Sequence, residues 1–255
     1  MHFKEDILRD CLIIIPTYNE SENIQLMMET VMNLSPRFEL LIVDDGSPDG
    51  TAQIVKDFIP TVDNRIHLLE RSGKLGLGTA YITGFKWALE RKYEYIFEMD
   101  CDFSHNPNDL LRLLEACEQG ADLSIGSRYI KGGQVENWPA DRVFISKYAS
   151  VYVRCITWMP VRDTTGGFVC YKRKVLETIA LDKLGFMGYA FQIEMKYATW
   201  RLGFKLKEIP ITFKDRELGN SKMSKGIVKE AITGVIIMQL NSLFRRNFYR
   251  KTLNL

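Results

Sequence analysis

The chain has 255 residues, of which 46% are hydrophobic and 26% charged, a composition typical of a folded protein with a substantial core. Its formal net charge of +2 at pH 7 argues against nucleic acid as a partner, so an anionic ligand must be met by a local group of cations. Five cysteines without a CxxC spacing argue against a disulfide framework and favour reduced thiols in a cytoplasmic protein.

No signal peptide and no membrane span are expected. The N-terminus is polar and charged, and the apolar run that follows it is too short for a secretory signal. The longest apolar segment, residues 227–244, is interrupted by Lys229, Glu230, Gln239 and Asn241. Because a span needs about 20 mostly apolar residues, we expect that the chain does not cross a bilayer.

The first half of the chain alternates short apolar runs with amphipathic segments. Strands are expected at Leu12–Ile15, Leu40–Val43, His67–Leu69, Tyr95–Met99 and Asp122–Gly126. Helices are expected after an N-cap at Asn19, and over Thr51–Phe58, Gly78–Glu90 and Pro107–Cys117. This alternation predicts an α/β fold with a mostly parallel, doubly wound sheet, in which ligands bind outside the carboxyl ends of the strands.

The regular alternation of strands and helices does not continue in the second half of the chain. Helices are expected near Asp141–Trp158 and Phe191–Leu202, a strand pair around Lys205–Phe213, and a terminal helix over Ser224–Arg246. No repeat, low-complexity tract or long linker separates the halves. We therefore expect residues 1–255 to form a single domain.

Two carboxylates follow the apolar run that ends at Met99. Asp100 and Asp102 are placed at a strand tip on the expected ligand-binding rim. Mg²⁺ and Mn²⁺ prefer carboxylate and phosphate oxygens, so this tip is suited to hold a cation against a diphosphate. The simpler alternative is that the acids only precede and cap the helix that starts near Pro107.

Two further segments on the same rim suit a nucleoside. Asp44 and Asp45 follow the second strand, and one of them can accept hydrogen bonds from a base or ribose while the other orders the loop. The segment from Pro16 to Glu20 offers the ring of Tyr18 and a carboxylate. Each segment also has a simpler interpretation: the one after the second strand is typical of a tight turn, and the one from Pro16 to Glu20 of a capped helix start.

Other motifs are weaker. The glycines of residues 73–78 fit neither a Walker A loop nor GxGxxG, because Tyr81 stands where the last glycine belongs, so a Rossmann dehydrogenase is disfavoured. Arg128 follows a strand and can pair with phosphate oxygens. The cations of residues 214–222 form a charged surface loop or a phosphate-binding loop. Those of the helix over 141–158 form a solvated face or bind an anionic lipid surface.

Five motifs together resemble a known family. They are Ile14-Ile15-Pro16-Thr17-Tyr18-Asn19-Glu20, Val43-Asp44-Asp45-Gly46-Ser47-Pro48-Asp49-Gly50-Thr51, Met99-Asp100-Cys101-Asp102, Gly126-Ser127-Arg128-Tyr129 and Asp215-Arg216-Glu217-Leu218-Gly219-Asn220-Ser221-Lys222. In this order they resemble the inverting family 2 glycosyltransferases, and among them the dolichol-phosphate and polyprenol-phosphate mannose synthases. The resemblance spans about residues 12–224.

The resemblance implies a GT-A fold in three parts. Residues 11–126 would form a Rossmann-like nucleotide-binding half, residues 127–224 a half with acceptor-side helices, and residues 225–255 an amphipathic helix and basic tail. The nucleotide-sugar site would comprise Pro16, Tyr18, Glu20, Val43, Asp45, Asp100, Cys101, Asp102, Arg128, Arg216 and Lys222.

The resemblance also implies the chemistry of the site. Asp100 and Asp102 would hold Mg²⁺ or Mn²⁺, and together with Arg128 would be the catalytic residues. Beside what the resemblance implies, we expect Arg142, Ser146 and Asp163 to meet the acceptor phosphate. Some relatives carry Gln as a further metal ligand where this chain has Ser104, so His105 or water would substitute.

The expected reaction is inverting, metal-dependent transfer of mannose from GDP-mannose to a polyprenyl or dolichyl phosphate. One alternative keeps the fold but uses UDP-glucose or another nucleotide sugar, with polyprenyl phosphate or a saccharide as acceptor. A saccharide hydroxyl would need a base, for which Asp163 or Glu194 is the candidate. A second alternative is a non-catalytic nucleotide-sugar-binding subunit, disfavoured because each acidic and cationic motif is intact.

The lipid acceptor implies contact with a membrane. We expect the chain to associate peripherally with the cytoplasmic face, through its basic-aromatic tail and the helix over 141–158, or through a membrane-anchoring partner protein. The alternative is that the terminal helix packs on the domain and the tail is frayed.

Overall fold

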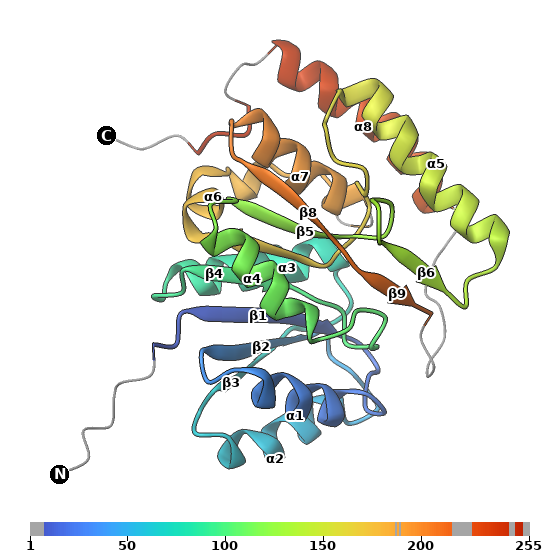
Figure 1. Cartoon of the computed structure of the whole chain (residues 1–255). Coiled ribbons are helices and arrows are strands. Elements are labelled where there is room, and N and C mark those ends of the chain that lie inside the picture. The colour runs from blue at the N-terminus through green and yellow to red at the C-terminus, as the bar shows by residue number, and fades with distance from the viewer. Residues whose placement is uncertain (1–7, 187, 189, 216–225, 245–247, 252–255) are drawn as a thin grey trace.

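A mixed sheet organises the chain (Figure 1). The structure, a computed structural model, describes residues 8–186, 188, 190–215, 226–244 and 248–251, with the backbone only for 226–232. Within these residues seven strands form a sheet in the order β3-β2-β1-β4-β7-β5-β8. Its strands are β1 (Cys11–Thr17), β2 (Phe38–Asp44), β3 (Ile66–Glu70), β4 (Tyr95–Glu98), β5 (Leu123–Ser127), β7 (Val169–Lys172) and β8 (Leu206–Pro210).

All neighbouring strands are parallel except β7, which runs antiparallel to both β4 and β5. The inner strands are buried on both faces, which explains why β1 and β2 are continuous apolar runs. Alternate β1 residues, Ile13 and Ile14, belong to the two separate hydrophobic cores on either side of the sheet. The parallel, doubly wound architecture predicted from the sequence is confirmed.

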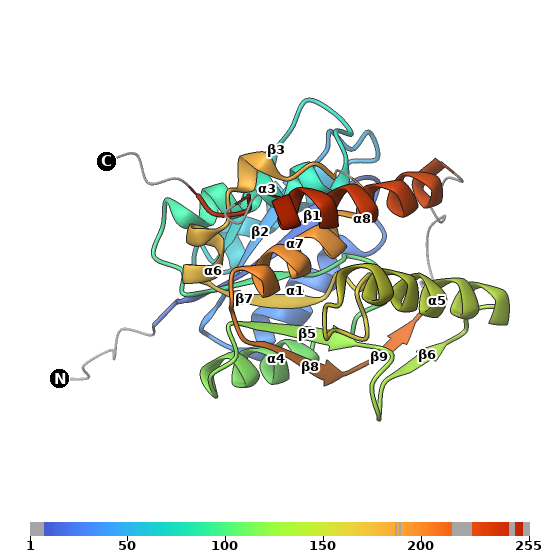
Figure 2. The ribbon, with the colours of Figure 1, turned by 90° about the horizontal axis from the view of Figure 1, so that it is seen from above.

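Helices cover both faces (Figures 1 and 2). The main helices are α1 (Ile24–Leu34), α2 (Thr51–Phe58), α3 (Leu77–Leu89), α4 (Asp109–Glu118), α5 (Ala140–Thr157), α6 (Arg173–Thr178), α7 (Ala190–Arg201) and α8 (Gly226–Phe244). Short 3₁₀ turns are η1 (Ile59–Thr61) and η2 (Leu181–Lys183). Helices α1, α2 and α4 contribute to the core on one face, whereas α3, α5, α6, α7 and α8 contribute to the core on the other.

The second half adds two features beside the sheet. A two-stranded parallel sheet joins β6 (Gln134–Glu136) to β9 (Thr212–Lys214), which continues the path of β8. Helices α5 and α8 lie side by side at the edge of the molecule (Figures 1 and 2).

Three local predictions are corrected. Asn19 does not cap α1: it has a left-handed φ of 56°, and the helix starts only at Ile24. The two strands expected within Lys205–Phe213 exist but do not pair with each other, because β8 pairs with β5 and β9 with β6. Strand β7 was not expected, and it lies in the middle of the sheet.

Candidate active site

Four of the predicted site segments, those that follow β1, β2, β4 and β5, lie along one edge of the sheet. β1, β2, β4 and β5 are parallel in direction and end at this edge, whereas the antiparallel β7 begins there. The loop of residues 163–167, which precedes β7, therefore lies on the same rim as the strand-end acids. We call this edge the rim.

The loops after β1 and β2 are bound to each other. Asp44 accepts hydrogen bonds from the hydroxyls of Thr17 (2.8 Å) and Ser47 (2.6 Å), so Asp44 is the acid that orders the loop. The backbone N–H of Asn19 donates to Ser47 Oγ and that of Glu20 to Thr51 Oγ1, each at 3.0 Å. The sequence reasoning placed these loops together, and the structure brings them together.

The proposed base-binding side chains line these loops. Pro16, Tyr18 and Glu20 are half-buried, whereas Val43 is fully buried in β2. The ring of Tyr18 lies 5.1 Å from the Nζ of Lys74, which comes from the glycine-rich segment.

Asp45 has a cationic partner that the sequence reasoning missed. The Nε of Arg71 donates to Asp45 Oδ1 at 2.6 Å, and both side chains are only 8% exposed. Nη1 of Arg71 donates to Thr79 Oγ1 at 2.8 Å, which fixes the guanidinium against α3. The available signal was position: Arg71 directly follows β3 and so reaches the same rim.

The double acid follows β4 as predicted. The side chain of Asp100 is 41% exposed, whereas Asp102 and Cys101 are buried. Asp102 Oδ1 accepts hydrogen bonds from the backbone N–H of Ser104 (3.1 Å) and from its hydroxyl (2.5 Å). Ser104 therefore orients a carboxylate.

His105 does not complete a set of metal ligands. Its ring is stacked on Phe168 with centroids 4.9 Å apart and meets the edge of Phe213 at 5.2 Å. Its Nδ1 lies 4.0 Å from Asp100 Oδ2, and burial lowers the pKa of His105 to about 4, so the ring is neutral at pH 7. Among the residues that the structure describes, no three His, Cys, Asp or Glu side chains are grouped to hold a metal ion.

The donor set still fits a hard divalent cation. Mg²⁺ is usually bound by one or two carboxylates together with substrate phosphates, rather than by a complete protein cage. Asp100 and Asp102 supply two oxygen-donor side chains on the rim, and the diphosphate of a nucleotide would complete the set.

Arg128 is held by Asp163. The guanidinium Nε donates to Asp163 Oδ2 and Nη2 to Oδ1, each at 2.7 Å, and the backbone N–H of Arg128 adds a third bond at 2.9 Å. Nη2 also donates to Thr165 Oγ1 at 2.9 Å. Burial acts to raise the pKa of Asp163, but the charge and hydrogen bonds of Arg128 hold it below its ordinary value. The pair is therefore ionised, and it joins the end of β5 to the loop that precedes β7.

Aromatic rings connect Arg128 to the predicted acceptor side. The Trp138 ring lies 5.6 Å from the Arg128 guanidinium and 4.0 Å from that of Arg142. Arg142 also donates to Asp215 at 3.1 Å. Ser146 accepts a hydrogen bond from the Tyr129 hydroxyl at 2.7 Å.

Arg128, Arg142, Ser146 and Asp163 thus come together through Trp138 and Tyr129, neither of which was predicted as a site residue. Arg216 and Lys222, the remaining predicted cations, lie outside the described residues.

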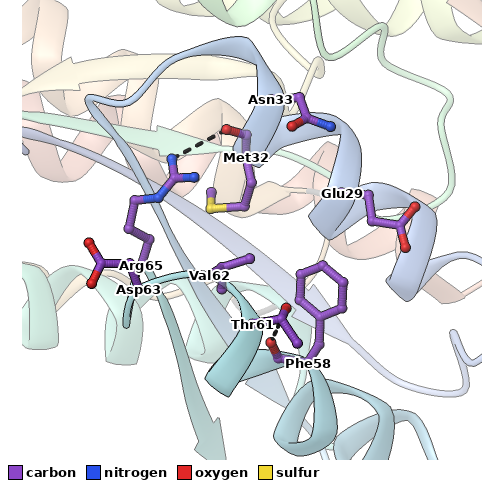
Figure 3. Close-up of a pocket in the computed structure, with 8 residues that line it drawn as sticks. All are labelled: Glu29, Met32, Asn33, Phe58, Thr61, Val62, Asp63 and Arg65. Atoms are coloured by element: carbon purple, nitrogen blue, oxygen red, sulfur yellow. Dashed lines mark hydrogen bonds between the residues drawn. The ribbon is translucent and has the colours of Figure 1, made fainter.

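A separate cavity of about 430 Å³ lies at the opposite edge of the sheet (Figure 3). It is lined by Glu29, Met32, Asn33, Phe58, Thr61, Val62, Asp63 and Arg65. In Figure 3, Arg65 donates to the Met32 carbonyl at 3.3 Å, beside the amino end of β3. Because ligands of such sheets bind at carboxyl ends, this cavity is not part of the candidate active site.

Solved structures share this architecture. The glucosyl-3-phosphoglycerate synthase of Mycobacterium tuberculosis, bound to Mn²⁺, UDP and glucosyl-3-phosphoglycerate, aligns with a TM-score of 0.64 over 96% of this chain and 82% of its own, at 16% identity. A mannosyltransferase of Pyrobaculum calidifontis, bound to GDP-Man and Mn²⁺, aligns with a TM-score of 0.58 over 94% of this chain and 65% of its own, at 17% identity. The fold is that of the GT-A glycosyltransferases.

Sequence comparison gives the family. Residues 12–180 match Glycosyl transferase family 2, and the chain belongs to this family. It is 47% identical over 221 residues to the polyprenol monophosphomannose synthase of Mycolicibacterium smegmatis, covering 87% of this chain and 83% of the relative. It is also 47% identical over 224 residues to the undecaprenyl-phosphate mannosyltransferase of Micrococcus luteus, covering 88% of this chain and 91% of the relative. The predicted family resemblance is confirmed.

Proposed function

We propose that this chain transfers mannose from GDP-mannose to a polyprenyl phosphate, with inversion at the anomeric carbon. The observation that carries the proposal is the 47% identity to two enzymes named for mannose transfer to polyprenyl phosphates, each over more than four fifths of both chains. A distant structural relative was solved with GDP-Man, which supports the guanine nucleotide. We assign donor binding mainly to residues 11–126 and acceptor binding mainly to residues 127–224.

The donor nucleoside would be bound by the joined loops after β1 and β2. Tyr18 offers a ring for base packing, and Glu20 and Asp45 offer carboxylates for a base N–H or a ribose hydroxyl, with Pro16 and Val43 shaping the floor. The contact of Arg71 with Asp45 supports this role, because a carboxylate fixed in direction accepts a hydrogen bond with less loss of entropy.

Asp100 and Asp102 would hold Mg²⁺ or Mn²⁺ beside the donor diphosphate, with the Cys101 backbone alongside. The cation supplies charge stabilisation for the departing GDP. Arg128, together with Arg216 and Lys222 beyond the described residues, would share this negative charge between donor and acceptor phosphates. Ser104 would keep Asp102 in its orientation.

The acceptor would be a phosphate monoester rather than an alcohol. Its second pKa is about 6, so the nucleophilic oxygen is largely ionised at pH 7 and needs no base. A saccharide hydroxyl would need a general base. The two candidate acids already have other partners, because Asp163 accepts hydrogen bonds from Arg128, and Glu194 accepts those of the Gly185 and Phe186 backbone N–H groups. A new bond forms between the phosphate oxygen and the anomeric carbon as the bond to GDP breaks.

The test is a donor and acceptor panel. Purified protein with Mg²⁺ or Mn²⁺ is given GDP-mannose or UDP-glucose together with a short-chain polyprenyl phosphate or a saccharide, and products are read by mass spectrometry. We expect a mannosyl-phosphate lipid from GDP-mannose, lost in Asp102→Asn and kept in the control Asp57→Asn on the exposed face of α2. A product formed only from UDP-glucose, or only on a saccharide, would contradict the proposal.

We also propose that the α5–α8 surface rests on an anionic bilayer. Five large apolar side chains of or beside α5 are exposed, Phe144, Ile145, Tyr148, Val151 and Trp158, and five of α8, Ile236, Ile237, Leu240, Leu243 and Phe244. Lys147 and Arg154 lie on the same α5 helix. Apolar side chains beside cations suit a membrane interface that carries the lipid phosphate. Within the described residues no helix is both long and apolar enough to cross a membrane.

Vesicle binding tests this surface. Ile237→Asp with Leu240→Asp should abolish co-sedimentation with vesicles containing anionic lipid, whereas Leu26→Asp, at an exposed position of α1, should leave it intact. Undiminished binding by the α8 variant would refute the surface. Binding that instead requires a membrane-anchoring partner protein would assign attachment to that partner.

A further inference from the structure

Lys196 is a fully buried lysine on a helix whose neighbouring positions are also buried. Residues 190–199 of α7 are all buried, and Lys196 is 0% exposed. Its ammonium lies 2.5 Å from the Gly166 carbonyl, 3.3 Å from that of Thr164 and 3.4 Å from that of Gln192. Three acceptors therefore meet the three N–H bonds of an ammonium.

Two of these carbonyls belong to the loop that holds Arg128. Asp163, the first residue of that loop, accepts three hydrogen bonds from Arg128, and Thr165 accepts a fourth. Asp163 Oδ1 also accepts the backbone N–H of Gly166 at 3.1 Å. The ammonium of Lys196 thus binds the backbone carbonyls of the loop, while side chains of the same loop bind the guanidinium of Arg128.

A core helix gains little stability from such a group. Moving an ammonium out of water costs several kcal/mol before its partners repay it, and an apolar side chain of similar volume often serves packing as well. Methionine fills gaps of this shape readily, and Met195 stands beside Lys196 on the same helix. The charge is therefore better explained by what it holds than by packing.

The surrounding charges keep the ammonium protonated at neutral pH. Burial lowers the pKa of Lys196 to about 8; Asp163, Glu98 and Glu208 raise it, and Arg128 lowers it. These groups come from the loop before β7, from β4, from β8 and from the end of β5 respectively. Above pH 8 the neutral amine has only two N–H bonds for three carbonyls, and its lone pair faces one of them.

We propose that Lys196 is a positioning residue, whose ammonium fixes the loop of residues 163–167 so that Asp163 presents Arg128 to the substrate phosphates. This inference rests on the proposed function, because it assumes that Arg128 meets a phosphate. Lys196 itself touches no substrate, and it acts through two successive contacts.

The first test separates binding from chemistry. In Lys196→Met, kcat/KM for polyprenyl phosphate should fall by roughly 10- to 100-fold, since a displacement of about 1 Å at a catalytic group costs up to that much. The affinity for GDP-mannose, measured by calorimetry, should fall by a smaller factor than kcat/KM, because Arg128 meets only its phosphates while its base and ribose are bound by the loops after β1 and β2. Lys56→Met on exposed α2 is the matched control. An unchanged kcat/KM in an active preparation would refute the inference.

The second test uses pH. Wild-type kcat/KM for the lipid phosphate should decline above about pH 8 as the ammonium loses its proton. In Lys196→Arg this decline should move to higher pH, because the guanidinium stays charged throughout the range. An identical alkaline decline in both proteins would overturn the inference.

A third measurement stands independently of turnover. The backbone amides of residues 163–167 should exchange with solvent faster in Lys196→Met than in wild type. The comparison is made under native conditions in which the amides of α3 exchange at the same rate in both proteins. Equal exchange rates in that loop would refute the inference that Lys196 fixes it, even if Lys196→Arg does not fold. If wild type fails to form any lipid product, the proposed function fails instead, and the exchange result still decides whether Lys196 holds the loop.

Discussion

At the scale of single residues, the ion pair between Arg128 and Asp163 dominates the site. The Asp163 side chain is fully buried and that of Arg128 is only 7% exposed, with two parallel hydrogen bonds between them. Asp163→Asn should therefore leave a buried guanidinium without a compensating charge, at a cost of about 3 kcal/mol or more in the free energy of unfolding. Urea unfolding measures this cost.

The matched variant is the double substitution of Arg128→Met with Asp163→Asn. It removes both charges, so it should be more stable than Asp163→Asn alone. A double variant less stable than the single one would show that the guanidinium stabilises the core by contacts other than its carboxylate partner.

The sequence predicts the location of single residues correctly where position along a strand decides it. Asp45, Asp100 and Arg128 reach the rim because each follows a parallel strand. Their partners were not predictable from spacing: Arg71 lies 26 positions from Asp45, and Asp163 lies 35 from Arg128. Such pairs depend on the tertiary arrangement of loops, which no local pattern encodes.

At the scale of elements, the packing of α3 on β1 depends on one small residue. A Cβ at Gly84 would lie 2.8 Å from Cγ2 of Ile14, which is itself fully buried. Gly84→Ala should therefore destabilise the fold by about 1–3 kcal/mol although alanine favours helix formation. Gly185→Ala, where an added Cβ meets nothing within 4 Å, is the control in the same denaturation experiment.

A Gly84→Ala variant as stable as wild type would mean that α3 shifts along β1 without loss. The activity of that variant should then be measured. Thr79, at the start of α3, accepts a hydrogen bond from Arg71, which also binds Asp45, so a shifted helix would displace Asp45 and lower the activity.

Most elements were predictable because their hydrophobic periodicity is strong. The expected helix over Thr51–Phe58 agrees with α2 at both ends. Strand β7 was missed because residues 169–172 are short and directly precede a helix, so no hairpin or βαβ signal marks them. The start of α1 was misplaced because Asn19 looks like an N-cap, whereas the hydrogen bond from its backbone N–H to Ser47 Oγ holds it outside the helix.

At the scale of the whole molecule, Glu194 links distant parts of the chain. Its carboxylate accepts the N–H groups of Gly185 and Phe186 at 2.9 and 3.1 Å and the Tyr249 hydroxyl at 3.4 Å. Burial raises the pKa of Glu194 from 4.5 to about 7, although these hydrogen bonds act to lower it.

The sign of the resulting pH dependence follows from proton linkage. Between pH 4.5 and 7 the folded state binds the Glu194 proton more tightly than the unfolded state, so this contribution to stability is complete below pH 4.5 and is lost as pH rises through about 7. Glu194→Gln stays neutral, so its stability relative to wild type should increase over this window by an amount on the order of 3 kcal/mol. Denaturation at several pH values, with exposed Glu22→Gln as control, measures the difference. A constant offset between the variant and wild type would contradict the prediction.

The antiparallel strand also governs how the chain can be made. A ribosome releases β4 long before β7, and until residues 169–172 emerge, one side of β4 has no partner in the sheet. An unpaired strand edge can pair with strands of other chains. The protein is therefore most prone to aggregate while it is being synthesised, before β7 covers this edge of β4. A fragment ending at residue 126 should for the same reason be poorly soluble, because it lacks the strand that covers this side of β4.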